Sequence, residues 1–249
     1  MKLYHYTSYK NFKSIWESQS LRFGDCGRAN DILESHRLKS TISPDSWKIL
    51  DKQLSEYRQI SFTMDFNECK KGFMSSMLWG HYGDKNQGVC IELDLEKLNI
   101  PPEVHHKPIN YVQSKQNIHC NKLTSTDISH FINDNISEIF FTKLDDWQAE
   151  NEYRLINNTN IAYLNISGAI TAIYITWKFH EDGYMSRCWH RKCNILEKLV
   201  GELEVRNFFY TELQGVLIPA CYSTRQDRRL VMENRRISKL AIEKLKKMQ

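Results

Sequence analysis

Alternation of apolar and polar residues marks several stretches of this 249-residue chain. A period of two is typical of strands with one buried face. Residues 88–93 have little polar interruption, which predicts a strand buried on both faces, and residues 169–177 form the most strand-like run of the chain. The strands that we expect are residues 2–7, 20–23, 59–64, 88–93, 103–112, 162–166, 169–177 and 214–219.

Apolar residues spaced by three and four predict the helices. Ser43 followed by Pro44 is typical of a helix start, because serine caps the first turn and proline fits its first position. The helices that we expect are residues 9–17, 43–57, 73–82, 128–142, 194–205 and 235–247. Strands and helices are mixed without a regular βαβ alternation, so we predict an α+β fold.

The stretch from Trp147 to Ile156 carries the most concentrated charge beside apolar residues. Glu150, Glu152 and Arg154 are two residues apart, and a strand sends alternate side chains to one face. We therefore expect two carboxylates and a guanidinium on one face of a strand. The alternative is the solvated face of an ordinary strand.

The composition of the chain limits the classes of protein to which it can belong. With 41% hydrophobic residues, the chain can form one large domain or a domain with an appended subdomain. The net charge of +4 does not demand a polyanionic partner. No apolar run is long enough to cross a membrane, and the first residues resemble a strand more than a signal peptide.

Seven scattered cysteines, with no signal peptide ahead of them, favour a reduced cytoplasmic protein. Cys188, His190 and Cys193 offer soft ligands, but their spacing fits no zinc pattern, and we expect no structural metal. The basic residues near the C-terminus predict a solvated helix face, with a weak RNA or partner contact as the alternative.

Polar residues on two predicted strands are candidates for ligand binding. His5 and Thr7 close the first strand and can offer hydrogen bonds to a cleft. Ser61 and Thr63 lie on one face of a later strand and could hold the polar edge of a ligand. The alternative is that all four are ordinary strand residues.

Two further segments offer aromatic and cationic groups. Trp79 and Tyr82 lie beside glycines, which let a ligand approach the backbone, while their rings provide flat walls. Arg28, just before a helix start at Asn30, could meet a phosphate. The alternatives are core aromatic residues and a polar loop with a helix cap.

Four segments in order resemble the bacterial family called domain of unknown function 2971 (DUF2971). They are residues 3–8, Asn30-Asp31 with Glu34, residues 79–83 followed by 88–91, and Trp147 with residues 150–154. The resemblance spans residues 3–177, and the ordered set is more specific than any one motif.

That family has been likened to the ADP-ribosyltransferase fold, with a split mixed or antiparallel sheet core. The resemblance implies one domain over residues 1–220 and a basic helical extension over 221–249. It places a histidine on a first core strand, a hydroxyl on a second and a glutamate on a later one. Here these would be His5, then Ser61 or Thr63 with Tyr82 competing, then Glu152, with Glu150 as the second acid of the pair.

The implied reaction is cleavage of the nicotinamide–ribose bond of NAD. Glu152 would stabilise the cationic ribose, Glu150 would serve the acceptor, and Arg28 or Arg154 would meet the pyrophosphate. The acceptor, protein or nucleic acid, is not identified. An NAD glycohydrolase and a non-catalytic nucleotide-, protein- or RNA-binding module are the alternatives. The family association also suggests a toxin or a role in phage defence.

Overall fold

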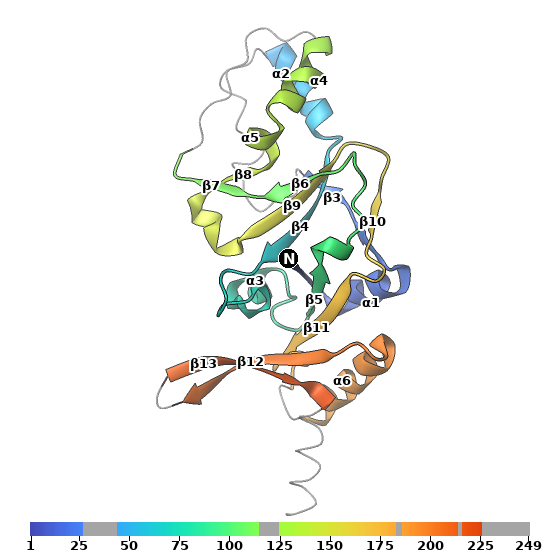
Figure 1. The fold of residues 1–249 in the computed structure, drawn as a ribbon, viewed down its shortest axis with the longest axis vertical. Coiled ribbons are helices and arrows are strands. Elements are labelled where there is room, and N and C mark those ends of the chain that lie inside the picture. The colour runs from blue at the N-terminus through green and yellow to red at the C-terminus, as the bar shows by residue number, and fades with distance from the viewer. Residues whose placement is uncertain (27–43, 115–124, 183–185, 214–215, 226–249) are drawn as a thin grey trace, which may run out of the picture. The chain divides into compact units, whose positions relative to one another are not determined.

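The computed structural model describes residues 1–26, 44–114, 125–182, 186–213 and 216–225 (Figure 1). The expected C-terminal helix, Arg28 and the segment from Asn30 to Glu34 lie outside these residues. The described chain mixes helices with parallel and antiparallel strands, which confirms the α+β class. No helix among the described residues is long and apolar enough to span a bilayer.

The chain forms two compact units, each assembled from three segments. The first unit comprises Met1–His5, Ile15–Gly72 and Leu93–Ala169. The second comprises Tyr6–Ser14, Phe73–Glu92 and Ile170–Gln249. One α-helix and two β-strands begin in one unit and end in the other, and they are β1 (Lys2–Thr7), α1 (Tyr9–Ser18) and β5 (Val89–Asp94).

The first unit is built on antiparallel strands. In order they are β1, β4 (Arg58–Met64), β9 (Glu152–Asn157) and β6 (His105–Pro108), and β3 (Gly24–Asp25) also pairs with β4. Thr63 on β4 lies opposite Tyr4 on β1 and Glu152 on β9. Residues directly opposite one another share a face, so these three form a row across the sheet.

Two small sheets complete the strands of this unit. β2 (Ser20–Arg22) pairs antiparallel with β10 (Tyr163–Asn165). β7 (Asn110–Val112) pairs parallel with β8 (Thr142–Leu144). The second pair brings the segment after β6 beside the segment that leads into β9.

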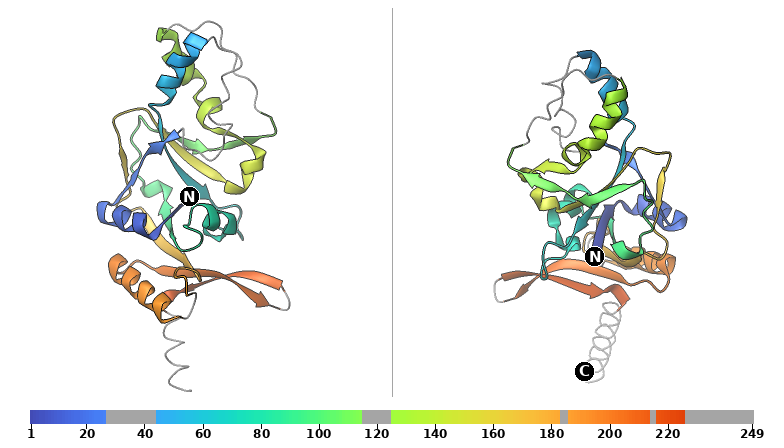
Figure 2. Two further views of the ribbon diagram at one scale, coloured as in Figure 1. Left: turned by 180° about the vertical axis from the view of Figure 1, so that it is seen from behind. Right: turned by 45° about the horizontal axis from the view of Figure 1, so that its top comes forward.

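Helices bury an apolar cluster in the first unit. α2 (Pro44–Leu54) and α4 (Ser125–Asp134) lie side by side in both views of Figure 2, and α5 (Ile136–Phe140) follows α4. The rings of Tyr57 and Phe140 stack with centroids 4.5 Å apart. The buried members of this cluster are Leu50, Tyr57, Ile109, Ile128, Ile132, Phe140, Phe141 and Ile156.

The second unit contains the strands β5, β11 (Ile170–Thr176), β12 (Val205–Leu213) and β13 (Val216–Ser223), neighbours in that order. β11 and β12 run parallel and are connected through α6 (Arg187–Val200), whereas β12 and β13 form an antiparallel pair. A short α3 (Ser76–His81) follows the 3₁₀ turn Gly72–Met74. The expected helix over 73–82 is therefore divided into a 3₁₀ turn and one short α-helix.

The expected single strand over residues 103–112 is wrong, because the chain changes partners at Ile109. β6 before it pairs with β9, and β7 after it pairs with β8. The Ile109 N–H donates to the carbonyl of Glu152, while the Asn110 N–H donates to the carbonyl of Phe141. Alternation of side chains does not report such a change of partner.

Two helix predictions differ from the structure in their bounds. The expected helix over 128–142 is interrupted at Asn135, whose side-chain amide donates to the carbonyl of Phe131 at 2.8 Å. The helix expected over 194–205 begins earlier, at Arg187, because Ser186 caps it by accepting from the Trp189 N–H at 3.0 Å. It ends before Gly201, which has a φ of 63°, and the nine-residue β12 that follows was not predicted.

The central stretch is a strand only from Glu152 onward. Residues Asp145–Glu150 form a 3₁₀ helix, η4, and Asn151 adopts a left-handed conformation with φ 45° and ψ 54°. Asn151 also donates from its side-chain amide to the carbonyls of Met64 and Asp65, at 3.3 and 3.0 Å. Glu150 therefore precedes the strand on which it was expected.

Substitution of Asn151 tests the importance of this turn. Asn151→Ala loses both amide contacts and puts a Cβ-bearing residue of poor left-handed propensity at the turn, so we expect unfolding to become easier by about 1–3 kcal/mol. Asn151→Gly loses the contacts but not the conformational fit, and should cost less. Chemical denaturation measures both, and an alanine variant as stable as wild type would contradict the prediction.

A buried charge cluster as the candidate functional site

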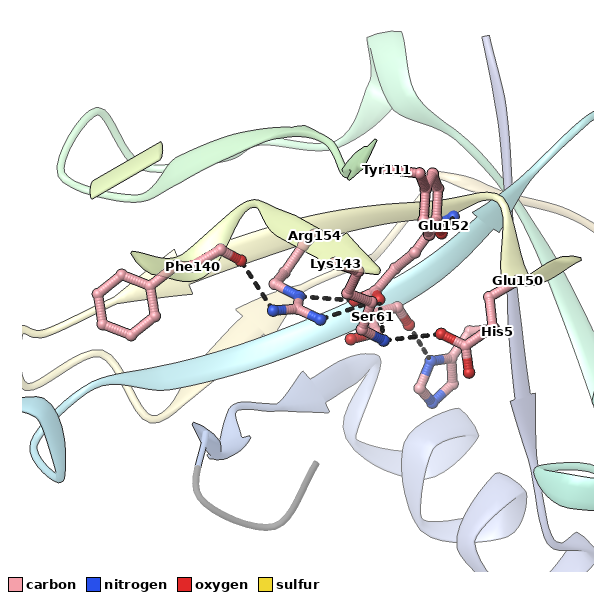
Figure 3. Close-up of polar contacts among 8 residues, drawn as sticks. All are labelled: His5, Ser61, Tyr111, Phe140, Lys143, Glu150, Glu152 and Arg154. Atoms are coloured by element: carbon pink, nitrogen blue, oxygen red, sulfur yellow. Dashed lines mark hydrogen bonds and ion pairs between the residues drawn. The ribbon is translucent and has the colours of Figure 1, made fainter. Parts of the chain in front are cut away.

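An ion pair within β9 forms the centre of the candidate site (Figure 3). Arg154 donates from Nε to Glu152 Oε1 at 2.6 Å and from Nη2 to Oε2 at 2.9 Å. The two residues alternate along the strand with Tyr153 between them, so their side chains share a face. Both are only 3% exposed, which makes this a buried two-point contact and not a solvated strand face.

Lys143 on β8 joins both glutamates. Its Nζ lies 2.7 Å from Glu150 Oε2 and 2.8 Å from Glu152 Oε2. Lys143 and Glu150 are each 5% exposed. The two carboxylates thus meet through one ammonium, although they do not share a strand face as expected.

Sequence reasoning missed Lys143. The one available signal was a lone lysine following Phe140 and Phe141 and preceding Leu144. A lysine in an apolar run needs a buried anion, yet the partner cannot be chosen from the run itself. Its true partners follow 7 and 9 residues later, across η4.

Neighbouring groups provide further contacts to the cluster. Arg154 donates from Nη1 to the carbonyl of Phe140 at 2.8 Å. The Glu152 N–H donates to the hydroxyl oxygen of Tyr111 at 2.9 Å. Lys143 Nζ also lies 5.5 Å from the centre of the Trp147 ring, a cation–π contact. Two carboxylates facing two cations leave the four buried side chains without net charge, which limits the cost of their desolvation.

The charge state of the site follows from these contacts. Burial by itself would raise the pKa of the Glu152 carboxyl, but Arg154 and Lys143 more than offset it and hold that pKa at about 2. Burial raises the pKa of Tyr111 to about 12. At neutral pH Glu152 is therefore a carboxylate and Tyr111 an uncharged phenol.

The two hydroxyl candidates on β4 share the face of the ion pair. Thr63 lies opposite Glu152 and Ser61 opposite Arg154. Thr63 is 5% exposed and belongs to the row with Tyr4 and Glu152. The pairing of β4 with β9 thus places the expected hydroxyl residues beside the strand that carries Glu152.

His5 also contacts β4 but lies outside that row. It follows Tyr4, and alternation turns the two side chains to opposite faces. The imidazole contacts the ring of Phe62 edge-on at 5.8 Å, and its Nδ1 donates to the Ser61 carbonyl at 3.3 Å. Burial lowers the pKa of His5, so the ring is neutral at pH 7 with its lone pair on Nε2. The expected convergence of His5 and Glu152 on one side of β4 is therefore not found.

The remaining candidates belong to the second unit or lie outside the described residues. Thr7 is buried, and Trp79 is a core residue whose Nε1–H donates to the Phe73 carbonyl at 2.8 Å. Tyr82 is 38% exposed at the end of α3. Arg28 lies outside the described ranges, so its expected contact with a pyrophosphate is not part of this geometry.

One family model matches the chain. Its description is "Protein of unknown function (DUF2971)", and it covers residues 78–155. The match includes the segments around Trp79 and Glu152 and confirms the resemblance to that family over these residues. No curated protein and no solved structure matches the chain.

Removal of the shared lysine tests whether the cluster supports the fold. Lys143→Met leaves two buried carboxylates facing one guanidinium, and we expect a loss of about 3–5 kcal/mol in the free energy of unfolding. The matched control is Lys71→Met, because Lys71 pairs with Asp65 at 3.3 Å near the surface and should contribute less than about 1 kcal/mol. Urea denaturation of both variants gives the comparison, and equal losses would contradict the buried cluster.

Acid should weaken the protein through Glu152. The folded pKa of about 2 lies below the ordinary value of 4.5, so the unfolded chain takes up the proton first. The stabilisation is present above pH 4.5 and disappears as the pH falls toward 2, by an amount on the order of 3 kcal/mol. Stability measured across this range should show a flatter profile for Glu152→Gln than for wild type. Glu103→Gln, at an exposed position, should keep the wild-type profile.

Proposed function

We propose that this chain is an NAD-dependent ADP-ribosyltransferase-like enzyme that cleaves the nicotinamide–ribose bond and transfers ADP-ribose to an acceptor. The observation that carries the proposal is an ionised Glu152 linked to Glu150 through Lys143. Glu152 stands on the third of three neighbouring strands, after the strand of His5 and the strand of Ser61 and Thr63. This strand order matches the one implied by the resemblance.

The chemistry needs a carboxylate that stays negative at neutral pH. When the C–N bond to nicotinamide breaks, its electron pair leaves with nicotinamide and positive charge develops on the ribose. A fixed carboxylate stabilises that charge most when it does not have to reorient during the reaction. Glu152 meets both requirements, because Arg154 and Lys143 hold it ionised and in place.

The other residues receive roles from their chemistry. The acceptor attacks the ribose carbon and loses a proton, for which Glu150 is the proposed base. His5 receives no role at the reacting ribose, because strand alternation turns its side chain to the face of β4 opposite to that of Glu152. Thr63 is proposed for the nicotinamide site, and Arg28 for the pyrophosphate. Arg154 is better assigned to holding Glu152.

The role as a toxin or in phage defence rests on the family resemblance alone. The cytoplasmic location is proposed from the scattered cysteines, and contact with RNA is proposed from the basic C-terminal residues. The acceptor is proposed to be a protein or a nucleic acid. None of these follows from the geometry of the charge cluster.

A specific observation favours a second candidate, a non-catalytic binding module. Glu152 is 3% exposed, and both of its oxygens accept hydrogen bonds from Arg154 or Lys143. In that case the cluster is a structural charge network, and a nucleotide, protein or RNA would bind elsewhere. The two candidates differ in whether the protein releases nicotinamide.

Nicotinamide release from NAD tests the proposal. Glu152→Gln keeps the shape of the side chain but removes its charge, so we expect release to fall by about a hundred- to a thousand-fold. Glu150→Gln should reduce transfer of ADP-ribose while slow release continues, because bond cleavage does not require the acceptor's base. Glu103→Gln serves as the control, and all rates are compared at a temperature where every variant is folded by circular dichroism.

Four outcomes decide between the candidates. Release together with ADP-ribose attached to a macromolecule supports the transferase, and release without attachment identifies an NAD glycohydrolase. Wild-type rates in Glu152→Gln would remove Glu152 from the mechanism. A wild-type protein that releases no nicotinamide would leave the binding module as the better description.

A further inference from the structure

Three side chains of different chemical type gather in the second unit, just before α6 and in its first turn. They are His180, Asp182 and Cys188, and their potential ligand atoms all lie within 4.8 Å of one another. His180 and Cys188 also line a surface hollow together with Tyr9, Gln87 and Arg191. These residues fall outside the part of the chain that the family model matches.

The local structure brings these groups into contact with one another. The Asp182 N–H donates to Nδ1 of His180 at 3.2 Å, so this nitrogen carries a lone pair and the proton is on Nε2. The carboxylate Oδ2 of Asp182 lies 3.5 Å from the same Nδ1. Cys188 is an exposed residue whose thiol hydrogen-bonds to Asp182.

These distances fit an ion in the middle. Two ligand atoms bonded at about 2.1 Å to a tetrahedral zinc ion lie about 3.4 Å apart. The observed 3.5 Å between Nδ1 and Oδ2 is close to that separation, and an ion bound at Nδ1 replaces the hydrogen bond from the Asp182 N–H. The ligand atoms of all three residues lie within 4.8 Å of one another, and the exposed Cys188 side chain can adjust its position to the ion.

We propose that His180, Asp182 and Cys188 bind a divalent transition metal ion of the zinc class. A nitrogen, an oxygen and a sulfur ligand are a set that zinc accepts, whereas a thiolate does not suit magnesium or calcium. Three protein ligands leave a fourth position for water or a small anion. Because His180 and Cys188 line the hollow, that position opens toward it.

The geometry of α6 explains why Cys188 and Cys193 do not bind the metal ion together. Cys188 and Cys193 are five residues apart on α6, which separates them by more than a quarter turn. Cys193 is fully buried, while Cys188 is exposed. Only Cys188 can therefore meet His180 and Asp182, which precede the helix.

Binding must release a proton. Metal ligation needs the thiolate, so the proton of the Cys188 thiol goes to solvent when the ion binds.

Cobalt(II) and zinc titrations of the full chain test the proposal. Wild type should bind one cobalt ion with the ultraviolet charge-transfer band of a cobalt–thiolate bond, and zinc should displace it. Cys188→Ser should abolish the band. His180→Ala and Asp182→Asn should each weaken zinc binding by at least about tenfold in calorimetry, since even outer partners of metal ligands contribute about 10- to 100-fold.

Matched controls are available in the first unit. Cys69→Ser removes another exposed cysteine, and His105→Ala removes another exposed histidine. Both should bind cobalt as wild type does. The proposal is overturned if wild type gives no thiolate band, if the band persists in Cys188→Ser, or if Cys69→Ser loses it. Because the readout is metal binding, its failure says nothing about NAD cleavage.

Discussion

Charge neutrality around Lys143 is the constraint on which the centre of the first unit depends. Glu150, Glu152, Lys143 and Arg154 are all at most 5% exposed, and each would be costly to bury by itself. Together they form two negative and two positive groups in direct contact. The contacts therefore fix the positions of β8, η4 and β9 relative to one another, because a displacement of any one would leave a charge uncompensated.

The same constraint links this centre to its surroundings. Arg154 reaches the last residue of α5 through the carbonyl of Phe140, and Phe140 itself belongs to the apolar cluster under α2 and α4. Tyr111 on β7 contacts the backbone of Glu152. A polar centre and an apolar cluster thus share residues, and the geometry of Glu152 is set by elements more than forty residues away in sequence.

The sequence predicted those features that depend on neighbours along the chain. Alternation identified β1 and β4, strand-like apolar runs identified β5 and β11, and the spacing of two in Glu152 and Arg154 correctly placed their side chains together. It misplaced Glu150, because the left-handed conformation of Asn151 ends the alternation there. It also missed Lys143, and it could not show that His5 leaves the row of Tyr4 and Thr63. The pairing of strands decides both the partners of Lys143 and the position of His5 relative to Thr63, and no local sequence pattern encodes that pairing.

The interleaving of the two units has a consequence for how the protein can evolve and be dissected. Each unit draws on three separate segments, and β1, α1 and β5 each begin in one unit and end in the other. No single cleavage of the polypeptide releases either unit intact. Exchange of one unit between proteins by gene fusion would need several coordinated crossovers. Limited proteolysis should accordingly yield nicked protein more readily than a separable domain.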